Sequence, residues 1–408
     1  MSHVLFLTQV LPYPLDAGPK IRAYYVLRHL ARHHDITLVT FIRPSDPPDA
    51  VKHLHNYCQR IVTVPIDRSL WRDVGAYSKS LLSDMPFLIT RDRVPRMEAA
   101  LLKIISEERF DVVHADQLWM AAYALYARMS ADQNGYQPNL ILDQHNAVHL
   151  IPARLAQNSA NPLIRQILQR EARLMRRYEA QVCDQFDRVV WVSGDDLKAV
   201  ASYQPSIQKL PLKTTIIPIC IDPQISNPVL PLPKSDRILF LGGMHWPPNA
   251  EGLRWIAQNV LPIVREQIPD VELLAVGKEP PADLQKTGGL SLPGYIEDVE
   301  SIWSGCRVFV VPLLSGGGMR VKILDTWAHG LPVVSTSIGA EGIKIKSGSN
   351  ILIADTPHEF SQAIVRILRD DELASQLGAS GRKTVEDTYN WRMIYKDWDK
   401  VYSLAHLR

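Results

Sequence analysis

Residues 309–335 have the sequence FVVPLLSGGGMRVKILDTWAHGLPVVS, and this stretch contains the most informative pattern in the chain. An apolar run typical of a buried strand precedes three glycines. A helical pattern then ends at Gly330, and a second apolar run follows. A strand, a loop, a helix and a strand in this order predict a βαβ unit. Because the loop leads into a helix N-terminus, where free backbone amides attract anions, the unit predicts an anion site.

The residues around this loop carry suitable chemistry for a phosphate ligand. The glycines at 316–318 let the backbone approach a ligand closely and present its amides. Arg320 and Lys322 add two cations, each of which contributes about 1.5–3 kcal/mol in a charged hydrogen bond. Asp325 could hold a sugar diol, although Lys322 and Asp325 could instead form a surface ion pair across one helical turn. No Gly-Lys-Ser/Thr follows the glycines, so we expect a diphosphate that is bound rather than hydrolysed.

Length and composition restrict the class of protein. The chain has 408 residues, enough for two domains, and a formal net charge of +2, which gives no reason to expect a nucleic-acid partner. Its four cysteines are scattered without a Cys-x-x-Cys pair, which favours a reducing compartment and argues against zinc. No apolar run is long enough to span a membrane, and residues 4–7 look like a first strand rather than a signal peptide. We therefore expect a cytoplasmic protein.

The run from Pro312 to Thr336, with Gly339-Ala340-Glu341-Gly342 behind it, resembles the donor site of retaining glycosyltransferases with the GT-B fold. The chain is most similar to glycosyltransferase family 4. This resemblance implies an α/β protein with two doubly wound, Rossmann-like domains of parallel sheet that face each other across a cleft. It also implies that a hexose is transferred with retention from a nucleotide-diphosphate sugar, such as a UDP- or GDP-sugar. No cofactor and no metal would be needed, and the pathway would be cell-envelope polysaccharide biosynthesis.

The domain boundaries follow from the same resemblance and from a proline-rich stretch. Residues 1–205 would form the acceptor-side domain, and residues 237–390 would bind the donor. Residues 206–236 contain several prolines and are expected to link the two domains. The last helix, residues 391–408, would cross back onto the N-terminal domain.

The resemblance also assigns expected roles to individual residues. Catalytic roles fall on His145, Arg320 and Lys322, with His145 contacting the transferred sugar. Residues expected to bind the donor are Gly18, Gly243, Lys278, Tyr295, Gly316, Gly317, Gly318, Met319 and Asp325. Residues expected on the acceptor side are Arg22, Asp116, Asp143 and Asn146. The simpler alternatives are that Gly18 forms a plain strand-to-helix turn, His145 a turn without a role, and Tyr295 an exposed turn residue.

The chain departs from the family pattern at two places. Ile219 and Cys220 replace an Asn-Gly pair, and Gly317 occupies the position of the first of two carboxylates. The identity of the transferred sugar therefore cannot be inherited from the family. After the strand expected at residues 237–243, a helix capped by Asn249 is expected. The loop between them has no obvious Arg or Lys, which leaves the phosphates to Arg320, Lys322 and the glycine amides.

A metal site is not expected from the sequence. Asp143 and His145 provide only two neighbouring ligands. Asp397 and Asp399 resemble a metal-binding Asp-x-Asp pair, but on a helix their carboxylates point about 200° apart.

Two segments leave a membrane contact open. Residues 67–96 combine large apolar with basic residues and could meet an apolar acceptor or the inner membrane face, or simply pack on the sheet. Residues 161–183 are rich in arginine and could touch anionic lipid or form a solvated helix face. The expected partners are thus a nucleotide-sugar donor, a carbohydrate or lipid-linked acceptor and, at most, a peripheral membrane contact. A GT-B nucleotide-sugar epimerase and a non-catalytic nucleotide- or carbohydrate-binding protein remain alternatives.

Overall fold

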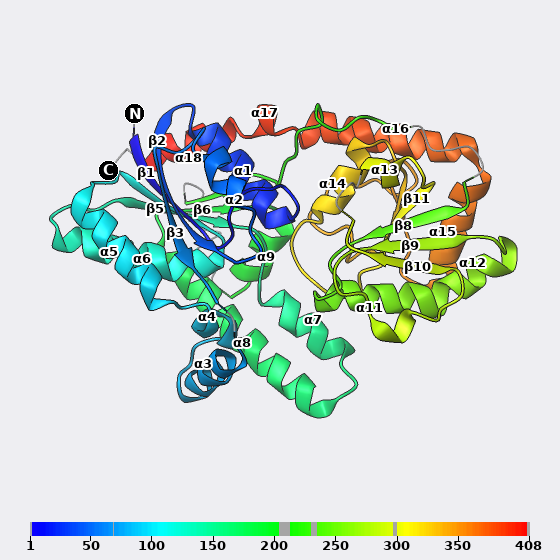
Figure 1. The fold of residues 1–408 in the computed structure, drawn as a ribbon, viewed down its shortest axis with the longest axis horizontal. Coiled ribbons are helices and arrows are strands. Elements are labelled where there is room, and N and C mark those ends of the chain that lie inside the picture. Colours follow the sequence, from blue (N-terminus) through cyan, green and yellow to red (C-terminus); the bar gives the residue numbers. More distant parts are fainter. Residues whose placement is uncertain (1, 68, 204–212, 230–234, 297–299, 406–408) are drawn as a thin grey trace. The chain divides into compact units, whose positions relative to one another are not determined.

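The computed structural model describes residues 2–67, 69–203, 213–229, 235–296 and 300–405. The chain folds into two compact units. Unit 1 comprises Met1–Cys220 and Trp391–Arg408, and unit 2 comprises Ile221–Asn390. Both are α/β units built on a parallel sheet (Figure 1), so the predicted fold class is confirmed.

The boundary between the units differs from the predicted linker of residues 206–236. Thr214–Ile216 form strand β7, which pairs with the preceding strand at the edge of the first sheet. Of the described residues in this stretch, 213–220 belong to unit 1, whereas 221–229 and 235–236 belong to unit 2. Residues 204–212 and 230–234 lie outside the described part of the chain.

Unit 1 contains a seven-stranded parallel sheet in the order β3-β2-β1-β4-β5-β6-β7. Its strands are β1 Ser2–Thr8, β2 His34–Ile42, β3 Arg60–Pro65, β4 Val112–Asp116, β5 Asn139–Gln144, β6 Arg188–Trp191 and β7 Thr214–Ile216. The inner strands consist of continuous apolar runs because helices cover both faces of the sheet (Figure 1). The apolar side chains of β1 and β4 are almost completely buried.

Helices connect these strands in the right order for a doubly wound domain. They are α1 Gly18–Leu30, α2 Pro48–Leu54, α3 Leu70–Leu82, α4 Phe87–Arg91, α5 Pro95–Glu107, α6 Leu118–Gln133, α7 Leu150–Asn158, α8 Pro162–Gln185 and α9 Gly194–Ala201. Asn161 caps α8 by accepting hydrogen bonds from the amides of Leu163 and Ile164, which explains where this long helix begins.

The C-terminal segment packs onto unit 1 as α17 Trp391–Ile394 and α18 Asp397–Ala405. Trp391 is completely buried and stacks on Tyr25 of α1 with ring centroids 5.2 Å apart. The Tyr402 hydroxyl lies 2.9 Å from Nδ1 of His114 in β4. Unit 1 is thus assembled from both ends of the chain.

Unit 2 contains a six-stranded parallel sheet in the order β10-β9-β8-β11-β12-β13. Its strands are β8 Arg237–Leu241, β9 Glu272–Val276, β10 Leu290–Gly294, β11 Val308–Val311, β12 Val333–Ser335 and β13 Leu352–Ile353. The helical segments are α11 Pro247–Trp255, η1 Ile256–Val260, α12 Leu261–Gln267, η2 Ala282–Leu284, α13 Glu300–Trp303, α14 Val321–Ala328, α15 Pro357–Arg369 and α16 Asp371–Thr388.

The strand order places ligand-binding edges in both units. In unit 1, β1 pairs with β2 on one side and with β4 on the other. In unit 2, β8 likewise lies between β9 and β11. At such a reversal the loops after the strands diverge, so a ligand can bind at their carboxyl ends. Asp116 ends β4, His145 follows β5, and the triple-glycine loop follows β11.

Among the described residues, none of the helices has both the length and the apolar composition needed to cross a bilayer.

Candidate active site

The triple-glycine loop of unit 2 connects β11 to α14 and has a conformation that needs glycine. Gly316 has φ 122° and Gly318 has φ 75°, both in the left-handed region that other residues rarely adopt. A Cβ atom on Gly316 would also lie 2.8 Å from Nη2 of Arg320. Substitution at Gly316 is therefore opposed by both backbone conformation and space.

Arg320 immediately precedes α14 and folds back over the loop. Its Nη1 donates to the carbonyl oxygens of Gly317 and Gly318. From this position at the start of α14, Arg320 lies on the loop side of the helix. The side chain of Arg320 is partly exposed, so the glycine loop and this guanidinium lie together at the surface of unit 2.

Lys322 lies in the first turn of α14 and reaches the end of β8. Its Nζ donates to the carbonyl oxygen of Leu241 at 2.8 Å and to Oδ1 of Asn249 at 3.2 Å. Both partners are neutral. Burial, with a smaller contribution from the nearby Arg320 cation, therefore lowers the pKa of Lys322 to about 7. A bound anion would stabilise its charged form.

Asp325 lies one turn further along α14 and remains partly exposed. No side-chain partner binds its carboxylate among the described residues, so the alternative of an ion pair with Lys322 is wrong. Burial raises the pKa of Asp325 to about 7. A half-buried carboxylate of this kind can accept hydrogen bonds from ligand hydroxyls.

Asn249 does not have the helix-capping role predicted for it. Helix α11 begins at Pro247, with Trp246 as the preceding residue. Asn249 lies inside the first turn, where its Nδ2 donates to the Gly243 carbonyl oxygen at 2.9 Å and its Oδ1 accepts from Lys322. The two adjacent prolines start the helix earlier, because proline is favourable in the first turn. Asn249 therefore connects the loop after β8 to the lysine.

The other residues predicted to bind the donor are more dispersed. Lys278 and Tyr295 are both exposed, and Nζ of Lys278 lies 4.8 Å from the centre of the Tyr295 ring. A Cβ atom on Gly243 would overlap with Cε1 of His245, and Met319 is buried. Gly18 belongs to unit 1, where it is the first residue of α1.

Glu251 was missed by the sequence reasoning. Its Oε2 accepts a 2.5 Å hydrogen bond from Oγ of Ser315, directly before the glycines. Glu251 belongs to α11 and is 64 positions away in sequence, so no local pattern indicated this contact.

A second cluster lies in unit 1, at the ends of β4 and β5. Nε2 of His145 is 2.9 Å from Oδ1 of Asp116 and 3.6 Å from Oδ2 of Asp143. Burial alone would lower the pKa of His145, but the two carboxylates more than offset this effect and raise it to about 9. His145 is therefore an imidazolium at neutral pH. Its Nδ1 is buried and has no hydrogen-bond partner among the described residues, which leaves one donor of the imidazolium unsatisfied in this conformation.

Arg22 corrects one prediction, because its buried side chain cannot contact an acceptor or a phosphate. Its Nε and Nη2 each donate to one oxygen of Asp143 at 2.9 Å. Its Nη1 donates to the Pro218 carbonyl at 2.6 Å and to the Tyr395 hydroxyl at 3.2 Å. Burial alone would raise the pKa of Asp143, but Arg22 holds it well below the usual range. Arg22 therefore orients Asp143, and through it the His145 cluster, from the buried side.

Asp116 and Asp143 are also completely buried, and their place on the acceptor side stays a prediction. Burial raises the pKa of Asp116, although its contact with His145 opposes this shift. Both carboxylates bind and orient His145. Of the acceptor-side predictions, only Asn146 has a partly exposed side chain.

Glu179 holds the loop that carries His145, a role that no pattern in the sequence indicated. One oxygen accepts from Nε2 of Gln144 at 2.9 Å and from the Val148 amide at 2.7 Å. The other accepts from the amide and from Nδ1 of His149, at 3.1 and 2.6 Å. Because Glu179 lies on α8 and is fully buried, it attaches this loop to a helix far away in sequence.

Asp116, Asp143 and His145 also satisfy the distance condition for a metal site, with ligand atoms within 4.8 Å of one another. The sequence counted only two of these ligands. However, Arg22 already binds both oxygens of Asp143, and its positive charge opposes a divalent cation nearby. Asp397 and Asp399 bind different partners, Lys400 and His29 respectively.

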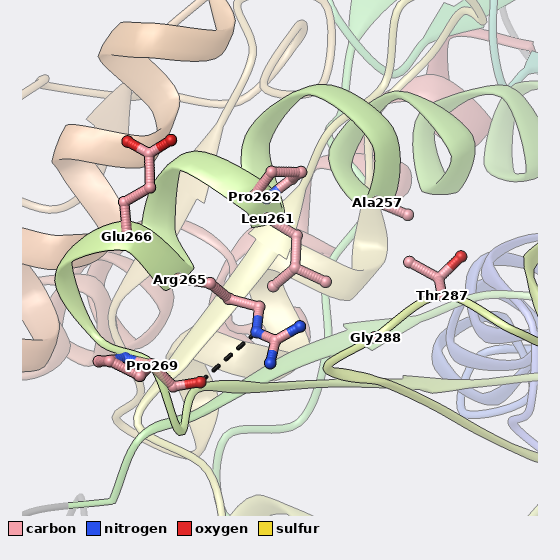
Figure 2. A pocket seen from close by; sticks show the side chains of 8 residues that line it. All are labelled: Ala257, Leu261, Pro262, Arg265, Glu266, Pro269, Thr287 and Gly288. Carbon is pink, nitrogen blue, oxygen red and sulfur yellow. Dashed lines mark hydrogen bonds between the residues drawn. The ribbon is translucent and has the colours of Figure 1, made fainter.

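A surface hollow of about 500 Å³ occurs elsewhere in unit 2, between α12 and the loop at residues 287–288 (Figure 2). Arg265 extends across it and donates from Nε to the Pro269 carbonyl oxygen at 3.4 Å. None of the residues predicted to form the donor site lines this hollow.

Comparison with known proteins agrees with this architecture. The family described as Glycosyltransferase Family 4 matches residues 18–225, and that described as Glycosyl transferases group 1 matches residues 235–370. An uncharacterized 44.6 kDa protein in the cps region of Klebsiella pneumoniae is 21% identical, over 97% of this chain and 98% of its own length. The lipopolysaccharide core biosynthesis glycosyltransferase LpsE of Rhizobium meliloti is 29% identical, over 28% of this chain and 33% of its own.

The fold also occurs in solved structures. Anabaena Alr3699/HepE in complex with UDP-glucose superposes with a TM-score of 0.68 at 13% identity, covering 99% of this chain and 100% of that one. Two parallel-sheet units, with a glycine loop in one and a histidine–carboxylate cluster in the other, define a protein of the GT-B class. Since the matching region spans more than half of the chain, the protein belongs to glycosyltransferase family 4.

Proposed function

We propose that the protein transfers a sugar from a nucleotide-diphosphate sugar to a carbohydrate or lipid-linked acceptor. The observation that carries this proposal is the glycine loop of unit 2 with Arg320 and Lys322 beside it. Lys322 has two neutral hydrogen-bond partners and a lowered pKa, so its charge is poorly compensated without an anion. A diphosphate would supply that compensation.

In this proposal each residue of unit 2 binds one part of the donor. The loop amides, Arg320 and Lys322 bind the two phosphates and stabilise the charge that develops on the leaving nucleoside diphosphate. Asp325, whose carboxylate has no partner within the described part of the chain, accepts from the ribose hydroxyls. Lys278 and Tyr295, which pack together, are proposed to lie beside the nucleobase.

His145 of unit 1 is proposed to contact the transferred sugar as a hydrogen-bond donor. With a pKa of about 9 it is a poor general base at neutral pH, but its Nδ1–H suits a sugar hydroxyl or an oxygen that becomes negative during transfer. Asp116, Asp143 and Arg22 fix the ring, and their charges balance those of the imidazolium. Because His145 is protonated and the two carboxylates beside it are buried, we propose that the departing phosphate deprotonates the acceptor, in a transfer that retains configuration and needs no metal.

The site of action is proposed to be the cytoplasm, in cell-envelope polysaccharide biosynthesis. Four buried, free cysteines support a reducing compartment. The names of the relatives in a cps region and in lipopolysaccharide core biosynthesis support the pathway class. A non-catalytic binding protein is the second candidate, because Gly317 lacks the carboxylate expected at its position.

The experiment combines ligand screening with one substitution. We expect UDP-, GDP-, dTDP- or ADP-sugars to raise the unfolding temperature, since a ligand at 100 times its Kd stabilises by about 2.7 kcal/mol. Lys322→Ala should abolish most of this shift and lower turnover with the accepted donor about 10²–10³-fold. Lys346→Ala, an exposed lysine of the same unit, is the matched control and should behave like the parent.

Three results would contradict these assignments. Full turnover by Lys322→Ala would remove the diphosphate role of this lysine. Release of nucleoside diphosphate without any acceptor would favour an epimerase, whereas donor binding with no turnover against a broad acceptor panel would favour the binding protein.

A further inference from the structure

Helix α3 leaves an unusually large apolar surface uncovered. Five of its side chains are strongly exposed: Leu70 83%, Trp71 86%, Val74 58%, Leu81 54% and Leu82 91%. Such large side chains are normally buried, and exposing several together costs free energy that binding can recover. The uncovered face of α3 is therefore a candidate contact surface.

The exposed residues form one continuous stripe. At 100° per residue, all five lie within about 120° of the helix circumference. Ala76 and Ser80 are buried and attach the helix to unit 1 from the opposite side. This is the pattern of an amphipathic helix that has one face on its own protein and another available to a partner.

Charges of both signs surround the stripe. Arg72 and Lys79 are exposed and lie along one edge, about 60–80° beyond it on the helix surface. Asp73 lies about 60° beyond the other edge, and Asp67 and Asp84 lie at either end of the helix. The basic edge of an apolar stripe complements a surface that is apolar inside and anionic outside, and the neighbouring helix α8 supplies the excess of cations.

Helix α8 lies beside α3 (Figure 1). Its arginines add positive charge to this part of unit 1. Arg170 donates to Oγ of Ser80 at 3.2 Å and to its carbonyl oxygen at 2.5 Å. Two acids of α8, Glu171 and Glu179, are buried in internal hydrogen bonds. Three of its arginines are exposed: Arg165, Arg173 and Arg177. Leu163, Ile164 and Ile167 in its first turns are also exposed.

We propose that α3, with the adjoining arginines of α8, docks the protein on the surface of a membrane that contains anionic lipids. Trp71 and Leu82 would enter the interface between headgroups and acyl chains, while Arg72 and Lys79 meet the phosphates. Attachment through Arg170 and through the buried face of α3 makes this a surface of the folded unit, so docking needs no unfolding. A lipid surface fits the observed charges better than an apolar protein groove, which would leave the basic flank without a partner.

The test measures binding to vesicles by co-sedimentation, with no donor or acceptor present. The full-length protein should bind vesicles of phosphatidylcholine with about 30% phosphatidylglycerol and bind pure phosphatidylcholine more weakly. Raising NaCl from about 0.1 to 0.5 M should weaken binding. The double variant Trp71→Ser, Leu82→Ser should lower the partition coefficient at least about tenfold. Because both side chains are exposed, its unfolding temperature should stay unchanged.

The matched control is Leu102→Ser, Met129→Ser, which removes two exposed apolar side chains elsewhere on unit 1 and should not change vesicle binding. Trp71→Phe should remove the blue shift of tryptophan fluorescence that vesicles cause in the parent. Failure of the parent to bind, or equal loss in both double variants, would overturn the proposal. A dimer in buffer that only the α3 variant dissociates, without vesicle binding, would instead show that a second copy covers this face. Since the assay needs no turnover, its outcome is independent of the proposed transfer reaction.

Discussion

At the scale of single residues, the two buried cationic side chains proposed to bind substrate have pKa values that are shifted in opposite directions. Burial and, to a smaller extent, the Arg320 cation lower the pKa of Lys322 to about 7, and its hydrogen-bond partners are neutral. His145 has its pKa raised to about 9 because two carboxylates face it. Lys322 is therefore sensitive to a bound anion at neutral pH, whereas His145 keeps its proton whether or not a ligand is present.

This difference predicts how nucleoside diphosphate binding depends on pH. A phosphate beside Lys322 raises its pKa, so binding above pH 7 must take up a proton. The affinity should therefore fall as the pH rises from about 7.5 to 9, approaching tenfold per unit. Calorimetry in two buffers with different ionisation enthalpies measures this proton uptake directly. The ligand is the nucleoside diphosphate of the sugar that gives the largest thermal shift.

Lys322→Arg separates this effect from the ionisation of Asp325, whose pKa is also about 7. Arginine keeps its charge throughout this range, so the variant should lose most of the pH dependence. If Lys322→Arg titrates like the parent, the dependence arises from another group.

At the scale of elements, the sequence was most informative where the pattern is local. The apolar strand, the glycine loop and the helix at residues 309–328 were predicted because their signals lie within adjacent residues. The roles of Asn249, Glu179 and Arg22 were not predictable in this way. Each depends on a contact between elements that are distant in sequence, and the sequence pattern around these residues is ordinary for a surface turn or helix.

Glu179 provides the sharpest prediction at this scale. Glu179→Gln replaces one acceptor oxygen by a donor that faces existing N–H groups, so at least one bond is lost and a buried polar group is left unpaired. We expect a loss of about 2–4 kcal/mol in the free energy of unfolding, measured with urea. Glu107→Gln, which weakens an exposed ion pair with Arg60, should cost less than about 1 kcal/mol. A loss for Glu179→Gln no larger than for the control would contradict the role of Glu179 as anchor of the His145 loop.

At the scale of the whole molecule, unit 1 depends on a segment that follows unit 2 in the chain. Trp391, Tyr395, Trp398 and Tyr402 are all buried, and Tyr395 also binds Arg22 behind the histidine cluster. The resemblance to the family gave the expectation that this helix returns to the N-terminal domain, whereas local periodicity alone shows only that it is amphipathic.

Deleting residues 391–408 should therefore destabilise unit 1 selectively. Loss of a buried tryptophan alone costs about 3–5 kcal/mol, so the calorimetric transition of unit 1 should disappear or fall by more than about 10 °C. The transition of unit 2 should remain. Met393→Ser, an exposed position in the same segment, is the control and should leave both transitions in place. Two unchanged transitions in the truncated chain would show that unit 1 is stable without its C-terminal part.

The split composition of unit 1 has a consequence for biosynthesis. Unit 2 is formed by one continuous segment, residues 221–390. Its whole sequence is therefore available before residues 391–408 are translated. Residues 1–220 cannot complete unit 1, and the faces of Tyr25 and His114 stay uncovered, until residues 391–408 have been translated. We therefore expect the unit whose sequence begins first to complete its fold second.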